Sequence, residues 1–142
     1  MITKNAEFLT ELRVLDVTEG DETRTFELEE DFVVYSGVLD AKITVPAGFR
    51  CDGESIPSWL HGLAPPFGQS KRGAIVHDYL YRNHGYYQEN SMFVPVSRSL
   101  ADKVYRELVL AKGLPKWQAT LRYLILVIAG WKAWNNNKTN DN

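Results

Sequence analysis

Residues 70–84 read SKRGAIVHDYLYRNH, and the apolar positions in this run recur with the 3.6-residue period of an α-helix. His77 and Asp78 interrupt the apolar side of that helix. Because successive helical residues differ by about 100°, the two polar residues share a broad face with Tyr81, and both are expected to point toward the core. Gly85 lies where the helix is expected to stop.

The polar pair on this face allows two interpretations. A buried carboxylate without a partner costs on the order of several kcal/mol. One interpretation is therefore a functional pair, in which a metal ion or a hydrogen-bond donor compensates Asp78. The other is a buried histidine with satisfied hydrogen bonds, next to an aspartate that faces solvent.

A second helix is predicted over about residues 98–112, with Asp102 on its apolar side. If Ser99 is the N-cap, Ser99-x-x-Asp102 has the form of a capping box, in which the acid satisfies a backbone N–H. Ser97 is an equally good N-cap and places Asp102 deeper in the helix. Antiparallel packing of the two helices would then bring Asp102 beside His77.

A third helix is predicted over about residues 115–134, and the polar residues 135–142 are predicted to form a disordered tail. Every position from 123 to 131 is apolar or glycine. This run is far shorter than the ~20 residues that span a bilayer, so the helix is not expected to be transmembrane. It is either a central helix buried by the rest of the fold or an aromatic surface for lipid or a partner protein, with Trp131 and Trp134 as anchors.

The first third of the chain has the two-residue period of β-strands. Residues 7–46 contain alternating apolar runs separated by turn residues, which predicts an antiparallel meander of three or four strands. Residues 47–69 hold many prolines and glycines and are expected to form a packed loop, and loops of that length tend to be functional. The sequence therefore predicts a single α+β domain over residues 1–134, with a β-meander followed by three helices.

Composition narrows the classes of function. A net charge of −2 over 142 residues argues against a general nucleic-acid binder, which would normally present a basic face. The single cysteine, Cys51, excludes an intrachain disulfide and indicates a reducing compartment. The first residues lack the apolar segment of a secretory signal, so we expect the protein to remain in the cytoplasm.

The polar residues on the two helices fit acid–base chemistry. A carboxylate on one ring nitrogen of a histidine fixes the tautomer and makes the ring more basic, which leaves the other nitrogen to take a proton from water. In such a site Asp102 orients His77. Asp78 is then available to a hard cation, with Asp52 and backbone carbonyls near Gly53 as further ligands.

Four motifs carry a resemblance to a known family: Asp52-Gly53-x-Ser55-x-Pro57, Pro66-Phe67-Gly68, His77 through Asn83, and Arg98-x-x-Ala101-Asp102. Together they resemble the core of bacterial and fungal secreted phospholipase A2. The resemblance implies an antiparallel helix pair of the phospholipase type, with His77 as the base that activates water and Asp102 as its orienting residue. It also implies calcium as a cofactor, with Asp78 as a ligand and Asp52 as a second candidate ligand. We expect the site to be lined by Gly53, Ser55, Tyr81 and Tyr105.

A broader resemblance covers about residues 26–134, including the stretches Thr44-Val45-Pro46-Ala47-Gly48-Phe49 and Leu114-Pro115-Lys116-Trp117. Here the chain resembles a phage and prophage family catalogued as domain of unknown function 1353. Two expectations follow. The first is a phage-type, phospholipase-A2-like hydrolase in the host cytoplasm that acts on lipid or at a membrane surface. The second is a non-catalytic phage virion protein, associated with the tail, or a host-interaction protein, with virion proteins as its partners and the same polar residues as a structural network.

In a third interpretation the histidines are ligands of a metal ion. His61, His77-Asp78 and Asp102 resemble the ligand set of the metal-dependent HD phosphohydrolases. Members of that class are all-helical, whereas residues 7–46 have the period of strands. His61 also lies in a proline-rich loop, and both facts weigh against this interpretation.

Overall fold

The computed structural model of the chain describes residues 5–17, 19–20, 25–51 and 71–139. Its strands are β1 (Glu7–Phe8), β2 (Val14–Asp16), β3 (Phe26–Leu28), β4 (Phe32–Ser36), β5 (Ala41–Val45), β6 (Arg50–Cys51), β7 (Gly85–Tyr87) and β8 (Phe93–Pro95). Its helices are α1 (Lys71–Asn83), α2 (Arg98–Ala111) and α3 (Lys116–Thr139). Antiparallel strands followed by three helices confirm the predicted α+β class.

The N-terminal strands form two small antiparallel sheets, with strand orders β1-β4-β5 and β2-β3-β6. The predicted single meander differs from this arrangement, because β1 pairs with β4 and β3 pairs with β6. The apolar period of a strand shows which side chains are buried but does not show which strand is its neighbour. The longest ladder joins β4 and β5, from Phe32 opposite Val45 to Ser36 opposite Ala41.

A short hairpin of β7 and β8 separates α1 from α2, and the sequence pattern did not predict it. Gly85 begins the hairpin, and a Cβ at this position would lie 2.2 Å from the carbonyl oxygen of Val94. Only a residue without a side chain fits so close to the facing strand.

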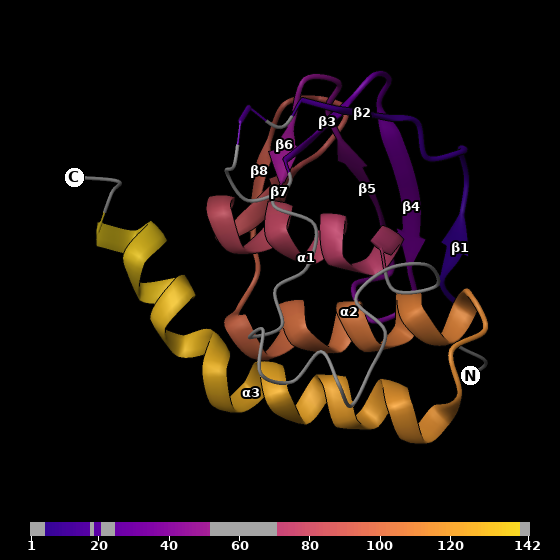
Figure 1. The fold of residues 1–142 in the computed structure, drawn as a ribbon, viewed down its shortest axis with the longest axis vertical. Helices are drawn as coiled ribbons and strands as arrows, with labels where there is room; N and C mark the ends of the chain where they lie inside the picture. Colours follow the sequence, from indigo (N-terminus) through magenta and orange to yellow (C-terminus); the bar gives the residue numbers. More distant parts are fainter. Residues whose placement is uncertain (1–4, 18, 21–24, 52–70, 140–142) are drawn as a thin grey trace.

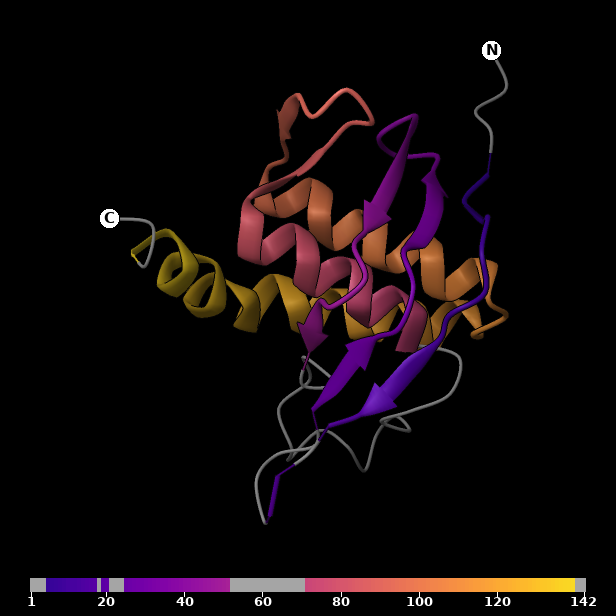
Figure 2. The same cartoon turned by 90° about the horizontal axis from the view of Figure 1, so that it is seen from above.

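The core lies between the sheet β1-β4-β5 and the two helices α1 and α2 (Figures 1 and 2). Along β4 the buried and half-buried residues alternate, as expected for a strand with one face on the core. The fully buried apolar side chains of this layer are Phe32, Val34, Ile43 and Val45 from the sheet, Ile75, Val76 and Leu80 from α1, and Val104 and Leu108 from α2. Burying each such side chain stabilises the fold by roughly 1.5–3 kcal/mol.

Helices α1 and α2 pack antiparallel and very close together. A Cβ on Gly73 would lie 3.0 Å from Cγ1 of Val109, so this glycine lets the two backbones approach. The N-cap of α2 is Ser97, whose hydroxyl accepts a hydrogen bond from the Leu100 N–H at 3.2 Å. Of the two caps that the sequence allowed, Ser97 is therefore the one used, and Asp102 lies within the helix rather than in a capping box.

Helix α3 packs on the side of α2 that is opposite the sheets (Figure 1). The structure differs from the predicted C-terminus, because α3 continues through residues 135–139, which the sequence pattern assigned to a disordered tail. No glycine or proline interrupts the run of asparagines there, and asparagine is only a moderately poor helix former. The C-terminal part of α3 lies beside the end of α1, where Trp134 stacks on His84 at 3.9 Å between ring centroids.

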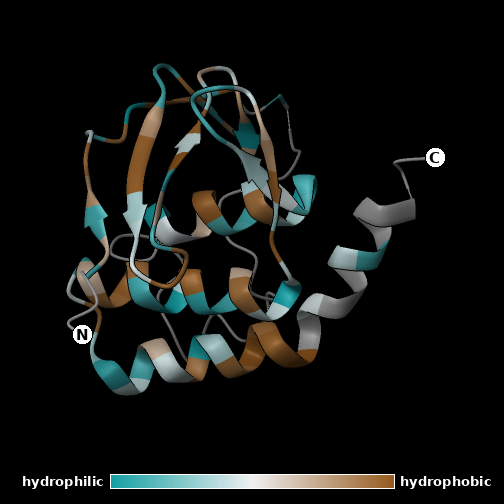
Figure 3. Ribbon diagram, turned by 180° about the vertical axis from the view of Figure 1, so that it is seen from behind, coloured by the Kyte–Doolittle hydropathy of each residue, from teal (hydrophilic) through white to brown (hydrophobic). Residues whose placement is uncertain are grey.

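The two long faces of α3 have different surroundings. One face is buried against the other helices through Ala119, Arg122, Leu126 and Gly130. We call the opposite side the outer face of α3, defined by Trp117, Leu121, Leu124 and Ile128, and its side chains are half-buried or exposed. In the hydropathy colouring α3 is mixed in its first turns and strongly apolar in its middle (Figure 3). Among the helices that the structure describes, none is long and apolar enough to cross a membrane.

Candidate functional site

The centre of the candidate site is a contact between α1 and α2. Nε2 of His77 lies 2.8 Å from Oδ1 of Asp102. The two side chains are buried, with exposed fractions of 2% and 1%. Because α1 and α2 run antiparallel, this pair meets near the middle of α1 and in the second turn of α2, as the sequence predicted for helices packed in this way.

A third side chain, Tyr81, completes the contact from the next turn of α1. Its hydroxyl donates to the same Oδ1 of Asp102 at 2.5 Å. Burial raises the pKa of the Tyr81 hydroxyl, and the hydrogen bond to Asp102 raises it further. Tyr81 is therefore a neutral donor, and Asp102 is the acceptor for both of its neighbours.

This arrangement fixes the tautomer of His77. A neutral imidazole carries a proton on one ring nitrogen and accepts on the other. Because Asp102 accepts, the Nε2–H of His77 donates to it, and Nδ1 is left with a lone pair. Nδ1 is buried and has no hydrogen-bond partner among the residues that the structure describes. Buried polar atoms without a partner are rare in native proteins, so this nitrogen requires an explanation.

Aromatic rings hold the imidazole in place. The Tyr81 ring lies 4.1 Å from the His77 ring, and Tyr105 meets it edge-on at 5.5 Å, both measured between centroids. The Tyr105 hydroxyl in turn lies 3.4 Å from Nη1 of Arg122, a side chain of α3 that is 1% exposed. Residues of α1 and α2 thus hold the imidazole in position and orientation, and Arg122 of α3 contacts Tyr105 behind it.

Asp78 lies in a different environment from its neighbour. It is 26% exposed, and its Oδ2 is 2.9 Å from Nη2 of Arg82, one turn later on α1. The expectation that both polar residues point toward the core therefore holds fully only for His77. Arg82 also lies over the Phe49 ring, 4.9 Å from its centroid, which ties the ion pair to the strand region.

The described residues do not by themselves fit a calcium ion. Calcium takes six to eight oxygen ligands, and Asp78 offers one carboxylate that is already paired with Arg82. No group of three or more His, Cys, Asp or Glu side chains gathers in the part of the chain that the structure describes. Asp52, Gly53, Ser55 and His61 lie outside the described residues. Calcium binding by Asp78 and Asp52 stays a prediction from the sequence, and no chemical step is derived through a metal.

Three further residues lie around the site to which the sequence analysis gave no role, although Arg98 begins one of its motifs. Arg98 lies near Tyr81, where its positive charge lowers the pKa of the Tyr81 hydroxyl against the two raising effects, and both of its terminal nitrogens lie 3.1 Å from the carbonyl oxygen of Val127 on α3. Gly130 approaches the same hydroxyl, because a Cβ on it would lie 2.5 Å from the Tyr81 oxygen. Arg122 is buried behind Tyr105. In the sequence, Arg122 could have been noticed as a charged residue at the edge of the apolar run of residues 123–131.

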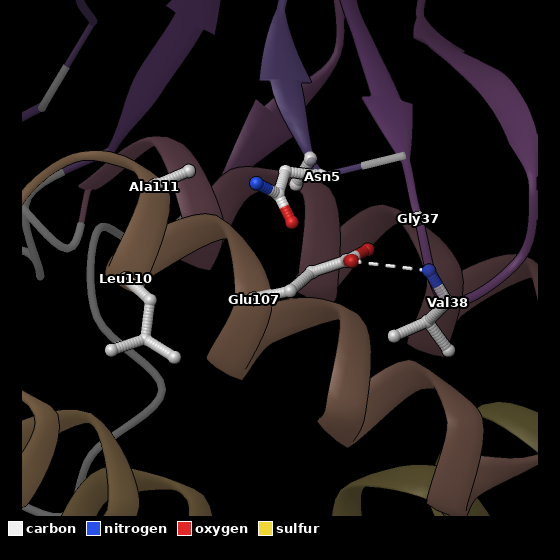
Figure 4. Close-up of a pocket in the computed structure, with 7 residues that line it drawn as sticks. Asn5, Gly37, Val38, Glu107, Leu110 and Ala111 are labelled. Atoms are coloured by element: carbon white, nitrogen blue, oxygen red, sulfur yellow. Dashed lines mark hydrogen bonds between the residues drawn. The ribbon is translucent and has the colours of Figure 1, made fainter. Parts of the chain in front are cut away.

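A separate polar contact joins α2 to the β4–β5 hairpin. The Glu107 carboxylate accepts hydrogen bonds from the Ser36 hydroxyl and from the Val38 N–H, the latter at 3.1 Å. Burial raises the pKa of Glu107, against the lowering effect of these donors. Glu107 lies beside a cavity (Figure 4). This cavity has a volume of about 660 Å³ and is lined by Asn5, Ala6, Gly37, Val38, Glu107, Leu110 and Ala111. Both carboxylate oxygens of Glu107 already accept hydrogen bonds within the fold, so Glu107 serves to attach the hairpin to α2.

Fold and site together define a small α+β protein with a histidine–aspartate pair buried between two antiparallel helices. The family model described as "Protein of unknown function (DUF1353)" matches residues 26–126. The chain belongs to this family, as the sequence resemblance indicated. No curated protein and no solved structure matches the chain.

Proposed function

We propose that the chain is a phage-type, phospholipase-A2-like hydrolase of ester bonds that acts in the host cytoplasm, with His77 as general base. The observation that carries the proposal is the Nδ1 atom of His77, which is buried, unprotonated in the tautomer that Asp102 imposes, and without a partner among the described residues. A nitrogen in this state is suited to accept a hydrogen bond from water and then to take its proton.

The chemistry follows from the neighbours of the ring. When Nδ1 takes a proton from a water molecule, the resulting hydroxide attacks the ester carbonyl and the imidazole becomes positively charged. The Asp102 carboxylate, 2.8 Å from Nε2, stabilises that charge. Tyr81 keeps Asp102 in position through its hydrogen bond, and protonated His77 then returns the proton to the leaving alcohol.

The proposal is tested with His77→Asn in purified full-length protein. We expect the wild type to hydrolyse a soluble short-chain ester and a phosphatidylglycerol substrate, and the variant to lose at least about a hundredfold in rate, as general-base removal typically does. Assays in calcium and in a chelator test the predicted metal separately. His84→Asn is the matched control, because it makes the same change in a half-buried histidine that stacks on Trp134.

Two results would contradict the enzyme proposal. One is a wild type that hydrolyses neither substrate with calcium or without it. The other is a His77→Asn variant that folds normally and keeps its rate.

The second candidate function is the non-catalytic virion or host-interaction protein, and the burial of the pair favours it. His77 and Asp102 have exposed fractions of 2% and 1%, which is typical of a structural polar network. This candidate predicts that the pair contributes to folding stability while the wild type shows no hydrolysis. The rate measurement on the wild type therefore separates the two candidates.

A further inference from the structure

Helix α3 is apolar on two opposite sides, which a helix at the surface of a monomeric domain does not require. Its inner side packs against α2 and α1. On the outer face, Trp117 is 63% exposed, Leu124 is 49% exposed and Ile128 is 74% exposed. Single exposed apolar residues are common, but a contiguous line of large ones indicates an interaction surface.

The outer face of α3 is a continuous surface. Its residues recur at intervals of three and four along the helix, so their side chains form one line. A shallow apolar hollow of about 710 Å³ lies along the first half of this line. It is lined by Lys116, Trp117, Thr120, Leu121 and Leu124. A lysine therefore stands directly beside the exposed apolar surface.

Charge is distributed unevenly along the chain, because the segment that runs from the end of α2 through α3 is basic. Residues 108–139 contain five basic residues (Lys112, Lys116, Arg122, Lys132 and Lys138) and no acidic residue. The whole chain has a net charge of −2, so the other residues together carry −2 − 5 = −7. Lys116 is exposed at the start of the outer face, and Lys112, at the C-cap of α2, is exposed as well.

We propose that the outer face of α3 binds the surface of an anionic phospholipid bilayer. A helix lying in the plane of the interface inserts a line of tryptophan and aliphatic side chains while its lysines contact the headgroups. Trp117 suits this position because its indole ring is apolar with one polar N–H. The inferred mode is contact with one leaflet, since none of the described helices could cross the membrane.

Two other occupants of the face fit the observations less well. A second copy of the chain would meet this face symmetrically, and a two-fold axis would place the same lysine-bearing helix against itself. A folded protein partner needs about 800 Å² on each side, which is more than one line of side chains on one helix supplies. Binding to a bilayer surface requires only the line of apolar side chains on the outer face of α3 and the positive charge beside it.

The test measures binding of the full chain to vesicles by co-sedimentation. We expect binding to vesicles of phosphatidylglycerol and phosphatidylcholine, weaker binding at high salt, and much weaker binding to phosphatidylcholine alone. Trp117→Ser combined with Ile128→Ser should weaken binding by more than about tenfold. Leu15→Ser combined with Met92→Ser is the matched control, since these side chains are 48% and 62% exposed in the strand region.

Several outcomes would overturn the proposal. They are wild type that does not bind the anionic vesicles, equal binding to both vesicle types, and equal loss in the test and control variants. Self-association of the wild type that disappears in Trp117→Ser/Ile128→Ser would assign the face to a second copy instead. The His77→Asn variant should bind vesicles like the wild type, so a failure of the proposed catalysis and a failure of lipid binding are distinguishable.

Discussion

Asp102 accepts two hydrogen bonds on one oxygen, from the ring of His77 and from the hydroxyl of Tyr81. Replacing Asp102 by alanine leaves both buried donors without an acceptor, and each unsatisfied group costs roughly 1–3 kcal/mol. We therefore expect Asp102→Ala to lower the free energy of unfolding by at least about 2 kcal/mol in urea denaturation. Asp78→Ala is the control at a partly exposed carboxylate and should cost less than about 1 kcal/mol. Equal losses in the two variants would contradict the buried network.

The effect of a Gly130→Ala substitution on stability is expected to depend on whether the Tyr81 hydroxyl is present. A Cβ at position 130 would lie 2.5 Å from the Tyr81 hydroxyl and 3.4 Å from Cε2 of the same ring. In the wild type, Gly130→Ala should cost about 1–3 kcal/mol, because the methyl group displaces a hydroxyl that is bonded to Asp102. In the Tyr81→Phe background the oxygen is absent. There alanine should be neutral or should stabilise α3 by up to about 1 kcal/mol through its helix propensity.

The four variants of this cycle are compared by urea denaturation. The predicted reversal of sign measures the contact between α3 and Tyr81 separately from any general effect of alanine in the helix. A cost for Gly130→Ala that is the same in both backgrounds would show that the Tyr81 hydroxyl does not cause it.

Among the secondary-structure elements, the β4–β5 hairpin and α2 are joined by a titratable group. Burial raises the pKa of Glu107 above its ordinary value of 4.5, so the folded protein keeps the proton to a higher pH than the unfolded chain does. Ionisation of Glu107 therefore costs stability as the pH rises from about 4.5 through the folded pKa. Glu107→Gln does not titrate and should escape this loss.

The measurement is the free energy of unfolding of both proteins between pH 4 and pH 7. The stability of the wild type relative to Glu107→Gln should fall as the pH rises across this window, whatever other groups contribute, because those groups are common to both. A relative stability that is constant, or that rises with pH, would contradict the raised pKa.

The helices could be predicted from sequence because the apolar period of a helix is local. Residues 70–84 and 98–112 locate α1 and α2 to within about a turn, and an antiparallel pair brings His77 and Asp102 together. The strand pairings could not be predicted, since β1 pairs with β4 across intervening chain. The β7–β8 hairpin was missed because its two short strands, with sequences GYY and FVP, show no alternation of apolar and polar residues.

The rest of the candidate site depends on contacts between distant segments. Gly130 approaches Tyr81 only because α3 returns to the end of α1, and nothing in the local sequence of α3 indicates this. The bond from Arg98 of α2 to the Val127 carbonyl oxygen depends on the same return. Whether α3 is buried or exposed could not be predicted from the sequence either. The sequence allowed either a central buried helix or an exposed aromatic surface, and α3 proves to be buried on one side and exposed on the other.

For the molecule as a whole, the layers separate two kinds of surface. The strands lie on one side of the α1–α2 pair, and the basic, apolar α3 lies on the other (Figure 1). Such an uneven charge distribution orients a protein in the field of a charged surface before contact. Association with an anionic surface should therefore present α3 first and leave the strand side facing solvent.

The close approach of α1 and α2 at Gly73 also limits where residues can be inserted into the chain or deleted from it. Gly73, His77 and Tyr81 are spaced by four residues, so they follow one another along the line of α1 that faces α2. Inserting a single residue between Gly73 and Tyr81 would rotate one end of that line by about 100° relative to the other. A side chain would then replace the glycine at the crossing, or the imidazole would leave its aspartate. Insertions and deletions during evolution should therefore collect in the connecting segments and avoid this stretch of nine residues.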